Sequence, residues 1–111
     1  MEPRFKGKVV LITGGSGGIG LTTAERFAHE GARVVIADLN GDAAKESAGA
    51  IAKAGGEAHA IQVDVSEEAS VRRMTATIKK VAGPPSILVH CAGIGTTLPL
   101  LETDLETWNK T

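Results

Sequence analysis

The sequence predicts an α/β fold, in which a parallel β-sheet has helices packed on both faces. Three short runs rich in Val, Ile and Leu, and a fourth run at 57–63 with partial alternation, alternate along the chain with four segments of helical periodicity. The first two runs lack the polar alternation of a sheet with one face in water, so we expect these strands to be buried on both sides. Right-handed helical crossovers between parallel strands account for this β-α-β-α-β-α-β-α order.

Each element is bounded by its own start and stop signals. In chain order the expected strands are 8–13, 33–37, 57–63 and 87–89, each followed by a helix, at 18–30, 40–54, 66–82 and from 103 onward. The strands are short runs, mostly of β-branched and apolar residues, whereas in the helical segments apolar residues recur at every third or fourth position. No internal repeat or linker interrupts residues 1–111, which we interpret as a single unit.

Glycine residues end the first two expected helices. The first stops at Gly31, and the second opens at Asn40 and closes at Gly55 and Gly56, since glycine is the preferred residue just past a helix. Apolar residues at helical spacing are Ile19, Ala24, Phe27 and Ala28 in the first helix, and the expected inward-facing residues of the second are Ala44, Ala48, Ile51 and Ala52.

The third and fourth helices carry polar signals. Ser66, followed by two acids, is expected to be the N-cap of the third helix, and glycine and prolines at 83–85 end it. One face of this helix is marked by Val71, Met74, Ile78 and Val81. Thr103 and Glu106 form a capping box that opens the last helix.

A glycine-rich turn joins the first strand to the first helix. Residues 13–20 read Thr-Gly-Gly-Ser-Gly-Gly-Ile-Gly. Gly14 permits a tight turn, the following glycines let the backbone approach a pyrophosphate, and Gly20 lets the helix pack closely. The helix N-terminus offers unpaired N–H groups to that pyrophosphate. A flexible loop without a ligand is the alternative, but the place in a β-α-β unit favours a Rossmann-type dinucleotide site. No Gly-Lys-Ser/Thr follows, which excludes a P-loop.

Asp38 ends the second strand, about twenty residues beyond the glycine turn, where an acid accepts hydrogen bonds from the adenosine ribose. Its charge would repel a 2′-phosphate, and residues 39–41 contain no Arg or Lys to neutralise one. The sequence therefore predicts NAD as the cofactor in preference to NADP. A helix-capping Asp in a turn is the alternative interpretation.

With these motifs the whole chain resembles the short-chain dehydrogenase/reductase family, and among its members the β-ketoacyl-carrier-protein reductases and hydroxysteroid dehydrogenases. The family pattern Thr-Gly-x-x-x-Gly-x-Gly is matched at 13–20, and its adenine-contacting Asp-Val is matched at 64–65. Its Asn-Asn-Ala-Gly turn stands here as His-Cys-Ala-Gly at 90–93, a departure at both asparagines, and its Leu…Trp pattern resembles residues 100–108.

The resemblance implies hydride transfer between a nicotinamide and a secondary alcohol or ketone, in a protein that forms homo-oligomers at full length. The family's proton donor is a tyrosine in a Tyr-x-x-x-Lys segment, assisted by a serine. Because this chain contains no tyrosine, we expect it to be a truncated, N-terminal cofactor-binding half that is inactive alone, and no catalytic residue is assigned. A non-catalytic dinucleotide-binding or regulatory module and a methyltransferase are the alternatives.

The expected cofactor contacts lie at the switch point between the first and fourth strands of a sheet ordered 3-2-1-4. They are Gly14, Ser16, Gly17, Gly18 and Ile19 near the pyrophosphate, Asp38 and Leu39 near the adenosine ribose, Asp64 and Val65 at the adenine, and Cys91, Ala92 and Gly93 on the nicotinamide side. The fourth strand would then be an unpaired apolar edge, which favours self-association and low solubility of the 111-residue chain.

Composition excludes several other classes of function. A net charge of −1 offers no basic field for nucleic acid or an anionic membrane. The longest apolar runs are far shorter than the roughly 20 residues of a membrane span. One cysteine and three dispersed histidines give no disulfide and no metal-ligand spacing. Residues 1–8 lack the features of a secretion signal, so we expect a cytoplasmic protein.

Overall fold

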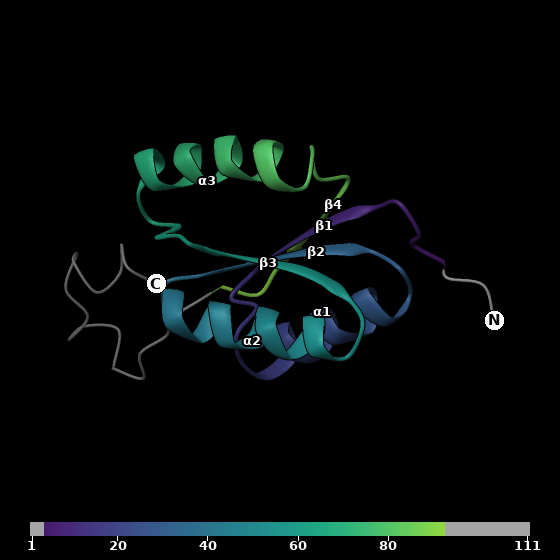
Figure 1. Cartoon of the computed structure of the whole chain (residues 1–111). Helices are drawn as coiled ribbons and strands as arrows, with labels where there is room; N and C mark the ends of the chain where they lie inside the picture. Colours follow the sequence, from purple (N-terminus) through teal and green to yellow (C-terminus); the bar gives the residue numbers. More distant parts are fainter. Residues whose placement is uncertain (1–3, 93–111) are drawn as a thin grey trace, which may run out of the picture.

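A computed structural model of the chain describes residues 4–92 and confirms the α/β, Rossmann-like fold. Four parallel strands, β1 (Val9–Thr13), β2 (Arg33–Asp38), β3 (Glu57–Gln62) and β4 (Ile87–His90), form one sheet in the order β3-β2-β1-β4. Helices α1 (Gly18–His29) and α2 (Gly41–Lys53) cover one face, and α3 (Glu68–Val81) covers the other (Figure 1). The helix expected from residue 103 lies outside the described residues.

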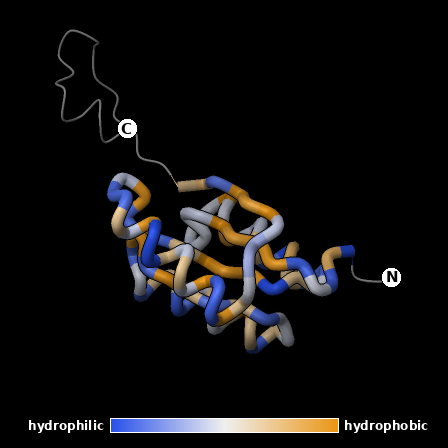
Figure 2. Tube along the Cα trace, turned by 90° about the horizontal axis from the view of Figure 1, so that it is seen from above, coloured by the Kyte–Doolittle hydropathy of each residue, from blue (hydrophilic) through white to orange (hydrophobic). Residues whose placement is uncertain are grey.

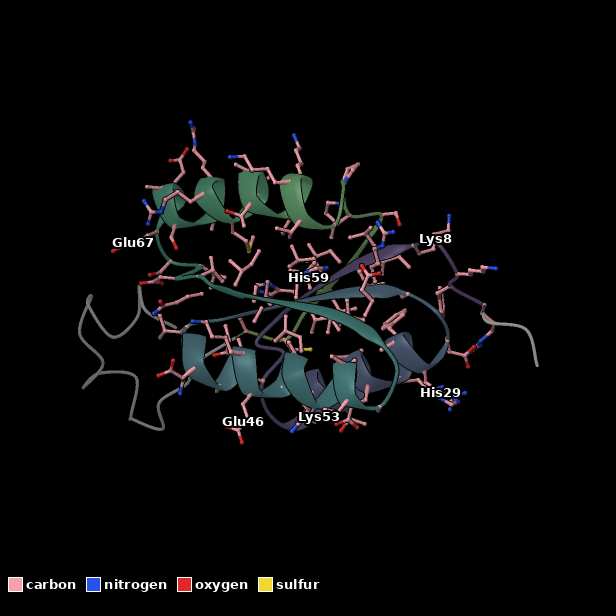
Figure 3. The ribbon with its side chains drawn as sticks, viewed as in Figure 1. Lys8, His29, Glu46, Lys53, His59 and Glu67 are labelled. Atoms are coloured by element: carbon pink, nitrogen blue, oxygen red, sulfur yellow. The ribbon has the colours of Figure 1, made fainter. Side chains whose placement is uncertain are left out.

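Alternate side chains of the central strands enter two separate cores. On the α1/α2 face the buried strand residues are Val10, Ile12, Val34 and Ile36, and on the α3 face they are Val9, Leu11, Val35 and Ala37. Apolar residues accordingly follow the central strands in Figure 2. All five residues of β1 are buried, as expected of a strand covered on both faces. Figure 3 shows Glu46 and Lys53 of α2 directed away from the sheet, while His59 lies between the sheet and α3.

Three helix positions differ from the sequence prediction. Ser66 is not the N-cap of α3, because its N–H and hydroxyl both donate to the Asp64 carboxylate, and the cap is Glu67. Ala52 is exposed, since the buried face of α2 runs through Ala44, Ser47, Ala48 and Ile51. Val81 is 45% exposed, and its expected place is taken by Ala82, one helical turn beyond Ile78.

The expected helix stops are confirmed. Gly31, Gly55 and Gly83 follow the caps of α1, α2 and α3 with φ values of 93°, 94° and 94°. At the end of α1 the Gly31 N–H donates to the Ala28 carbonyl and the Ala32 N–H to the Phe27 carbonyl, which is a Schellman motif. These sharp stops return the chain directly to the next parallel strand.

The segment before β1 is held by the end of α1. The Glu30 side chain is 5% exposed and accepts from the guanidinium groups of Arg4 and Arg26, at 3.2 and 3.0 Å. The Phe5 N–H donates to the Glu30 carbonyl. The rings of Phe5 and Phe27 pack edge to face, with their centroids 4.9 Å apart. Hydrogen bonds from the Arg4 side chain and backbone hold the pKa of Glu30 below its usual value, against the opposing effect of burial.

We expect Glu30→Gln to lower the thermal unfolding temperature at pH 7, because Arg4 and Arg26 lose their charged partner. A carboxyl group with a lowered pKa in the folded state stabilises above its unfolded value of 4.5, and this contribution is lost as pH falls through the folded value. The difference between wild type and variant should therefore shrink below about pH 4.5. Thermal unfolding followed by circular dichroism measures it, with exposed Glu25→Gln as the control. A difference that stays constant down to pH 2.5 would contradict this assignment.

The β4 edge has the character expected of an unpaired strand. Within residues 4–92, β4 pairs only with β1, and Leu88 on the α3 face is 63% exposed. Self-association of the 111-residue chain through this edge stays a prediction.

Candidate functional site

Parallel strands bring four turns to the carboxyl edge of the sheet. These turns follow β1, β2, β3 and β4. Together with the end of β2 and the start of α1, they hold eleven of the twelve residues expected to contact a cofactor; the twelfth, Gly93, lies outside the described residues. Three large apolar side chains are exposed at this edge: Ile19 at the start of α1 is 80% exposed, and Leu39 and Val65 in the next two turns are 63% and 43% exposed. Apolar side chains left in solvent at one edge are typical of a surface that a ligand covers.

The glycines of the β1–α1 turn divide into packed and open positions. Gly14 has a φ of 68°, and a Cβ there would lie 2.7 Å from the Ala92 nitrogen. A Cβ on Gly20 would lie 2.2 Å from the Gly14 carbonyl oxygen. A Cβ on Gly17 or Gly18 would meet nothing within 4 Å. Gly14 therefore lets the turn pack against the residues that follow β4, and Gly20 lets α1 pack against Gly14. The inner pair, Gly17 and Gly18, faces open space.

The N-terminus of α1 is left uncapped by the part of the chain that the structure describes. Its N-cap is Gly17, without a side-chain hydrogen bond, and its first turn contains no acid. By contrast, the Asn40 side chain caps α2 by accepting from the Ala43 N–H at 3.0 Å, and Asp42 lies in its first turn. The first amides of α1 and the positive end of its dipole are therefore available to an external anion.

Asp38 is brought directly against the glycine turn. Its Oδ2 accepts from the Ser16 hydroxyl and, at 3.3 Å, from the Ser16 N–H, while its Oδ1 accepts from the Asn40 N–H at 3.0 Å. Partial burial raises the pKa of Asp38, but these hydrogen bonds outweigh it and leave the pKa below its ordinary value. The carboxylate is therefore ionised at neutral pH. Asn40 caps α2, so Asp38 is not the helix cap.

The β3–α3 turn places Asp64 beside an exposed apolar residue. Asp64 Oδ1 accepts from the Ser66 hydroxyl at 2.6 Å and its N–H at 3.0 Å, and these bonds hold the Asp64 pKa below its ordinary value. The Asp64 N–H donates to Ser70 of α3 at 2.9 Å. A hollow of about 460 Å³ lies beside this turn, lined by residues that include Leu39, Gln62, Asp64 and Arg73.

The turn after β4 is attached to β1. The Cys91 N–H donates to the Thr13 carbonyl at 2.9 Å, and the Ala92 N–H lies 3.5 Å from the Thr13 hydroxyl. The same hydroxyl lies 2.8 Å from Nδ1 of His90. Sequence reasoning did not identify this Thr13–His90 pair; the replacement of an expected asparagine by His90 was the available signal.

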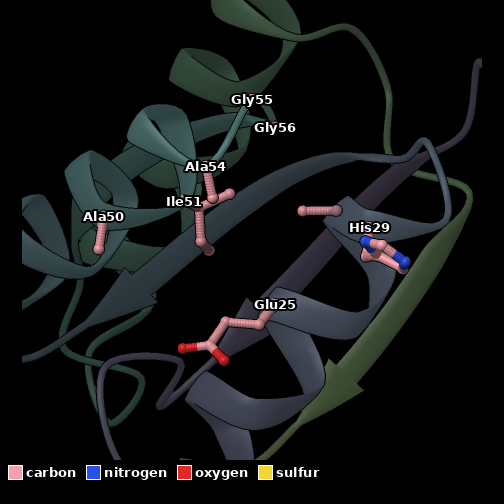
Figure 4. Close-up of a pocket in the computed structure, with 8 residues that line it drawn as sticks. Glu25, His29, Ala50, Ile51, Ala54, Gly55 and Gly56 are labelled. Carbon is pink, nitrogen blue, oxygen red and sulfur yellow. The ribbon is translucent and has the colours of Figure 1, made fainter.

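A second hollow lies at the opposite end of the helices. It is about 370 Å³ and is lined by Glu25, Ala28, His29, Ala50, Ile51, Ala54, Gly55 and Gly56. Figure 4 shows it between the C-terminal halves of α1 and α2, with Glu25 and His29 on one side. None of its lining residues is among the predicted cofactor contacts.

Residues 4–92 contain neither a metal-binding cluster nor a helix that could span a membrane. No group of three or more His, Cys, Asp or Glu side chains there has the arrangement of a metal site. None of the helices in that range combines the length and apolar character needed to cross a membrane.

Comparison with known proteins places this geometry in one family. The family model described as short chain dehydrogenase matches residues 8–111. The chain is 44% identical to a 2,5-dichloro-2,5-cyclohexadiene-1,4-diol dehydrogenase of Sphingobium indicum, covering 99% of this chain and 44% of that protein. It is 38% identical to an NADP-dependent (R)-specific alcohol dehydrogenase of Lentilactobacillus kefiri, covering 99% of this chain and 43% of that protein.

A solved structure gives the same result. The crystal structure of a short-chain type dehydrogenase/reductase from Mycobacterium marinum matches with a TM-score of 0.85 and 39% identity, over 92% of this chain and 41% of that chain. The chain thus spans less than half the length of each of these three relatives. It belongs to the short-chain dehydrogenase/reductase family.

Proposed function

We propose that this chain is the dinucleotide-binding part of an NAD-dependent oxidoreductase acting on a secondary alcohol or ketone. The observation that carries the proposal is the Ser16 bridge, which joins an uncapped helix N-terminus to an ionised Asp38 at the carboxyl edge of the sheet. An anion-binding backbone and a carboxylate next to each other match the pyrophosphate and the ribose of a dinucleotide.

The described residues fit such a cofactor. The open positions Gly17 and Gly18, with the first amides of α1, would hold the pyrophosphate. Asp38 would accept from the adenosine ribose, and Leu39 with Val65 would cover the adenine beside Asp64. The backbone of Cys91 and Ala92 would line the nicotinamide side. When bound, the cofactor supplies or accepts a hydride at its nicotinamide ring.

Cofactor preference follows from the charge of Asp38. An ionised carboxylate repels a 2′-phosphate, and residues 14–20 and 39–41 contain no Arg or Lys. We therefore propose NAD, although one relative is named as NADP-dependent. The two cofactors differ only in this phosphate, so residue 38 is the place to test the preference.

The substrate class is proposed from relatives. Among them are a cyclohexadiene-diol dehydrogenase and a meso-2,3-butanediol dehydrogenase of Serratia marcescens, the latter 36% identical over 96% of this chain. A small secondary alcohol or ketone fits these names. Because the chain has no tyrosine to act as the family's proton donor, we propose that the 111-residue chain binds the cofactor without turnover. Homo-oligomer formation at full length and a cytoplasmic location complete the proposal.

Titration with NADH and with S-adenosylmethionine tests this function. We expect the chain to bind NADH, seen as enhanced nicotinamide fluorescence and as heat in calorimetry, and to show no saturable heat with the methyl donor. The exposed variant Asp42→Asn serves as a control for changes in net charge. Saturable binding of the methyl donor with none of NADH would favour a methyltransferase, and catalytic turnover by the 111-residue chain would contradict the tyrosine argument.

A further inference from the structure

A side-chain hydrogen bond links the ends of β1 and β4 at the carboxyl edge of the sheet. Thr13 and His90 are directly paired across the two parallel strands, and the Thr13 hydroxyl lies 2.8 Å from His90 Nδ1. Thr13 is only 4% exposed, whereas His90 is exposed. The imidazole therefore covers a buried hydroxyl at the point where both strands enter their turns.

The direction of this hydrogen bond follows from the groups around Thr13. The Ala92 N–H, at 3.5 Å, can only donate, so the Thr13 oxygen accepts on that side. The buried Thr13 O–H then has Nδ1 of His90 as its acceptor, because with the hydrogen bond reversed this proton would have no acceptor among the described residues, and Nδ1 therefore carries the lone pair. This arrangement places the ring proton on Nε2 and gives a chain that runs from Ala92 through Thr13 to His90.

The same turn is in contact with the glycine loop. A Cβ on Gly14 would lie 2.7 Å from the Ala92 nitrogen and 2.8 Å from the Cys91 carbonyl carbon, so the two turns touch backbone to backbone. The position of Cys91 and Ala92 thus determines where the glycine loop starts. A hydrogen bond that orients the Ala92 amide acts on the loop through this contact.

We propose that His90 is a positioning residue for cofactor binding: as the Nε2–H tautomer it accepts from Thr13 and so holds the Cys91–Ala92 turn against Gly14. The role in cofactor binding rests on the proposed function, whereas the tautomer and the hydrogen bond do not. His90 needs no contact with the cofactor for this role.

Substitutions at position 90 can identify the nitrogen that matters. The Oδ1 of asparagine is attached to Cγ, as is Nδ1 of histidine, so His90→Asn keeps an acceptor at the same distance from the backbone. The Oε1 of glutamine lies one bond further out and matches Nε2 instead. His90→Leu removes every acceptor. Asparagine should therefore preserve the link, and both glutamine and leucine should break it.

The first measurement is the dissociation constant for NADH of the full 111-residue chain. We expect His90→Asn to stay near wild type, and His90→Gln and His90→Leu to bind NADH about three- to tenfold more weakly, the loss of one hydrogen bond. Thr13→Val should weaken binding at least as much, because it also removes the acceptor of the Ala92 N–H. In the Thr13→Val background, His90→Leu should cause no further loss. His29→Leu, an exposed histidine near the other end of α1, is the control. Equal affinity of all His90 variants, or rescue by glutamine and not asparagine, would overturn the proposal.

The second measurement does not depend on cofactor binding. At about pH 8.5, where a free imidazole is neutral, ¹⁵N shifts of His90 should show protonated Nε2 and unprotonated Nδ1. This pattern should change towards a tautomer mixture in Thr13→Val. A proton on Nδ1 of the wild type would refute the inference whatever NADH does. A third outcome is that the wild type shows the expected His90 tautomer but does not bind NADH. The proposed function then fails, and the positioning role in cofactor binding fails with it.

Discussion

Replacing Gly14 by alanine is expected to destabilise the chain by about 2–5 kcal/mol and to abolish cofactor binding. At a φ of 68°, a non-glycine residue costs about 1–2 kcal/mol. The new Cβ would also lie 2.7–2.9 Å from backbone atoms of Cys91 and Ala92, and overpacking of this kind costs about 1–3 kcal/mol more. Because β1 and β4 both end here, neither strand can shift without losing its register. Urea unfolding followed by circular dichroism measures the effect.

Two other glycines provide matched controls for the same substitution. Gly49 is exposed within α2 with open space around it, so Gly49→Ala should stabilise by about 0.5–1 kcal/mol. Gly17 is also open and is proposed to face the pyrophosphate. As the N-cap of α1 it is a better cap than alanine, so Gly17→Ala should cost no more than about 1 kcal/mol, less than Gly14→Ala, and still weaken NADH binding. If Gly14→Ala unfolds at the same urea concentration as wild type, the backbone contact with Ala92 does not limit stability.

Much of the fold could be predicted because its signals are local. The four strands, the three described helices and their glycine stops are each encoded by neighbouring residues, such as the apolar run before Gly14 or Gly31 after α1. The sheet order 3-2-1-4 followed from the Rossmann-type pattern as a whole and not from a signal in one segment. The errors occurred where one local signal competed with another. Ser66 bonds to Asp64 instead of capping α3, and Val81 and Ala82 are neighbours of which only one can face the core.

The candidate site was predictable as a set of residues and less so as a set of contacts. Parallel topology alone brings the four turns to one edge, so the motifs identify which residues meet. Motifs do not specify which side chains bond to each other across turns. The Ser16–Asp38 bond joins residues 22 apart in sequence, and the Thr13–His90 bond joins residues 77 apart. Both depend on the register of strands, which only the folded chain defines.

Removing the charge of Asp38 is expected to weaken NADH binding and to reduce the preference for NADH over NADPH. Asp38→Asn keeps the shape and one acceptor oxygen but replaces charge-assisted hydrogen bonds by neutral ones, a loss of about 1–2 kcal/mol, or roughly 5- to 30-fold in affinity. The affinity for NADPH should fall less than the affinity for NADH, because the same change removes the repulsion between Asp38 and the 2′-phosphate. Adding Leu39→Arg, at the next and exposed position, should invert the preference, since a guanidinium pairs with phosphate. Calorimetric titration with each cofactor measures both affinities.

The pH dependence separates this charge effect from a loss of structure. The pKa of Asp38 is below its ordinary value of 3.8, so its carboxylate stays ionised and this contribution to NADH affinity should be level from neutral pH down to about pH 5. The contribution of the carboxylate to NADH affinity disappears only as pH falls through the lowered pKa of Asp38. The Asp38→Asn variant should not show this decrease in affinity at acidic pH. Asp42→Asn, in the first turn of α2, is the control. Arg73→Ala tests whether the cation lining the adjacent hollow binds the 2′-phosphate instead. If Asp38→Asn weakens NADH and NADPH by the same factor, the carboxylate does not discriminate between the cofactors, because a charge that repels only the 2′-phosphate must affect the two unequally.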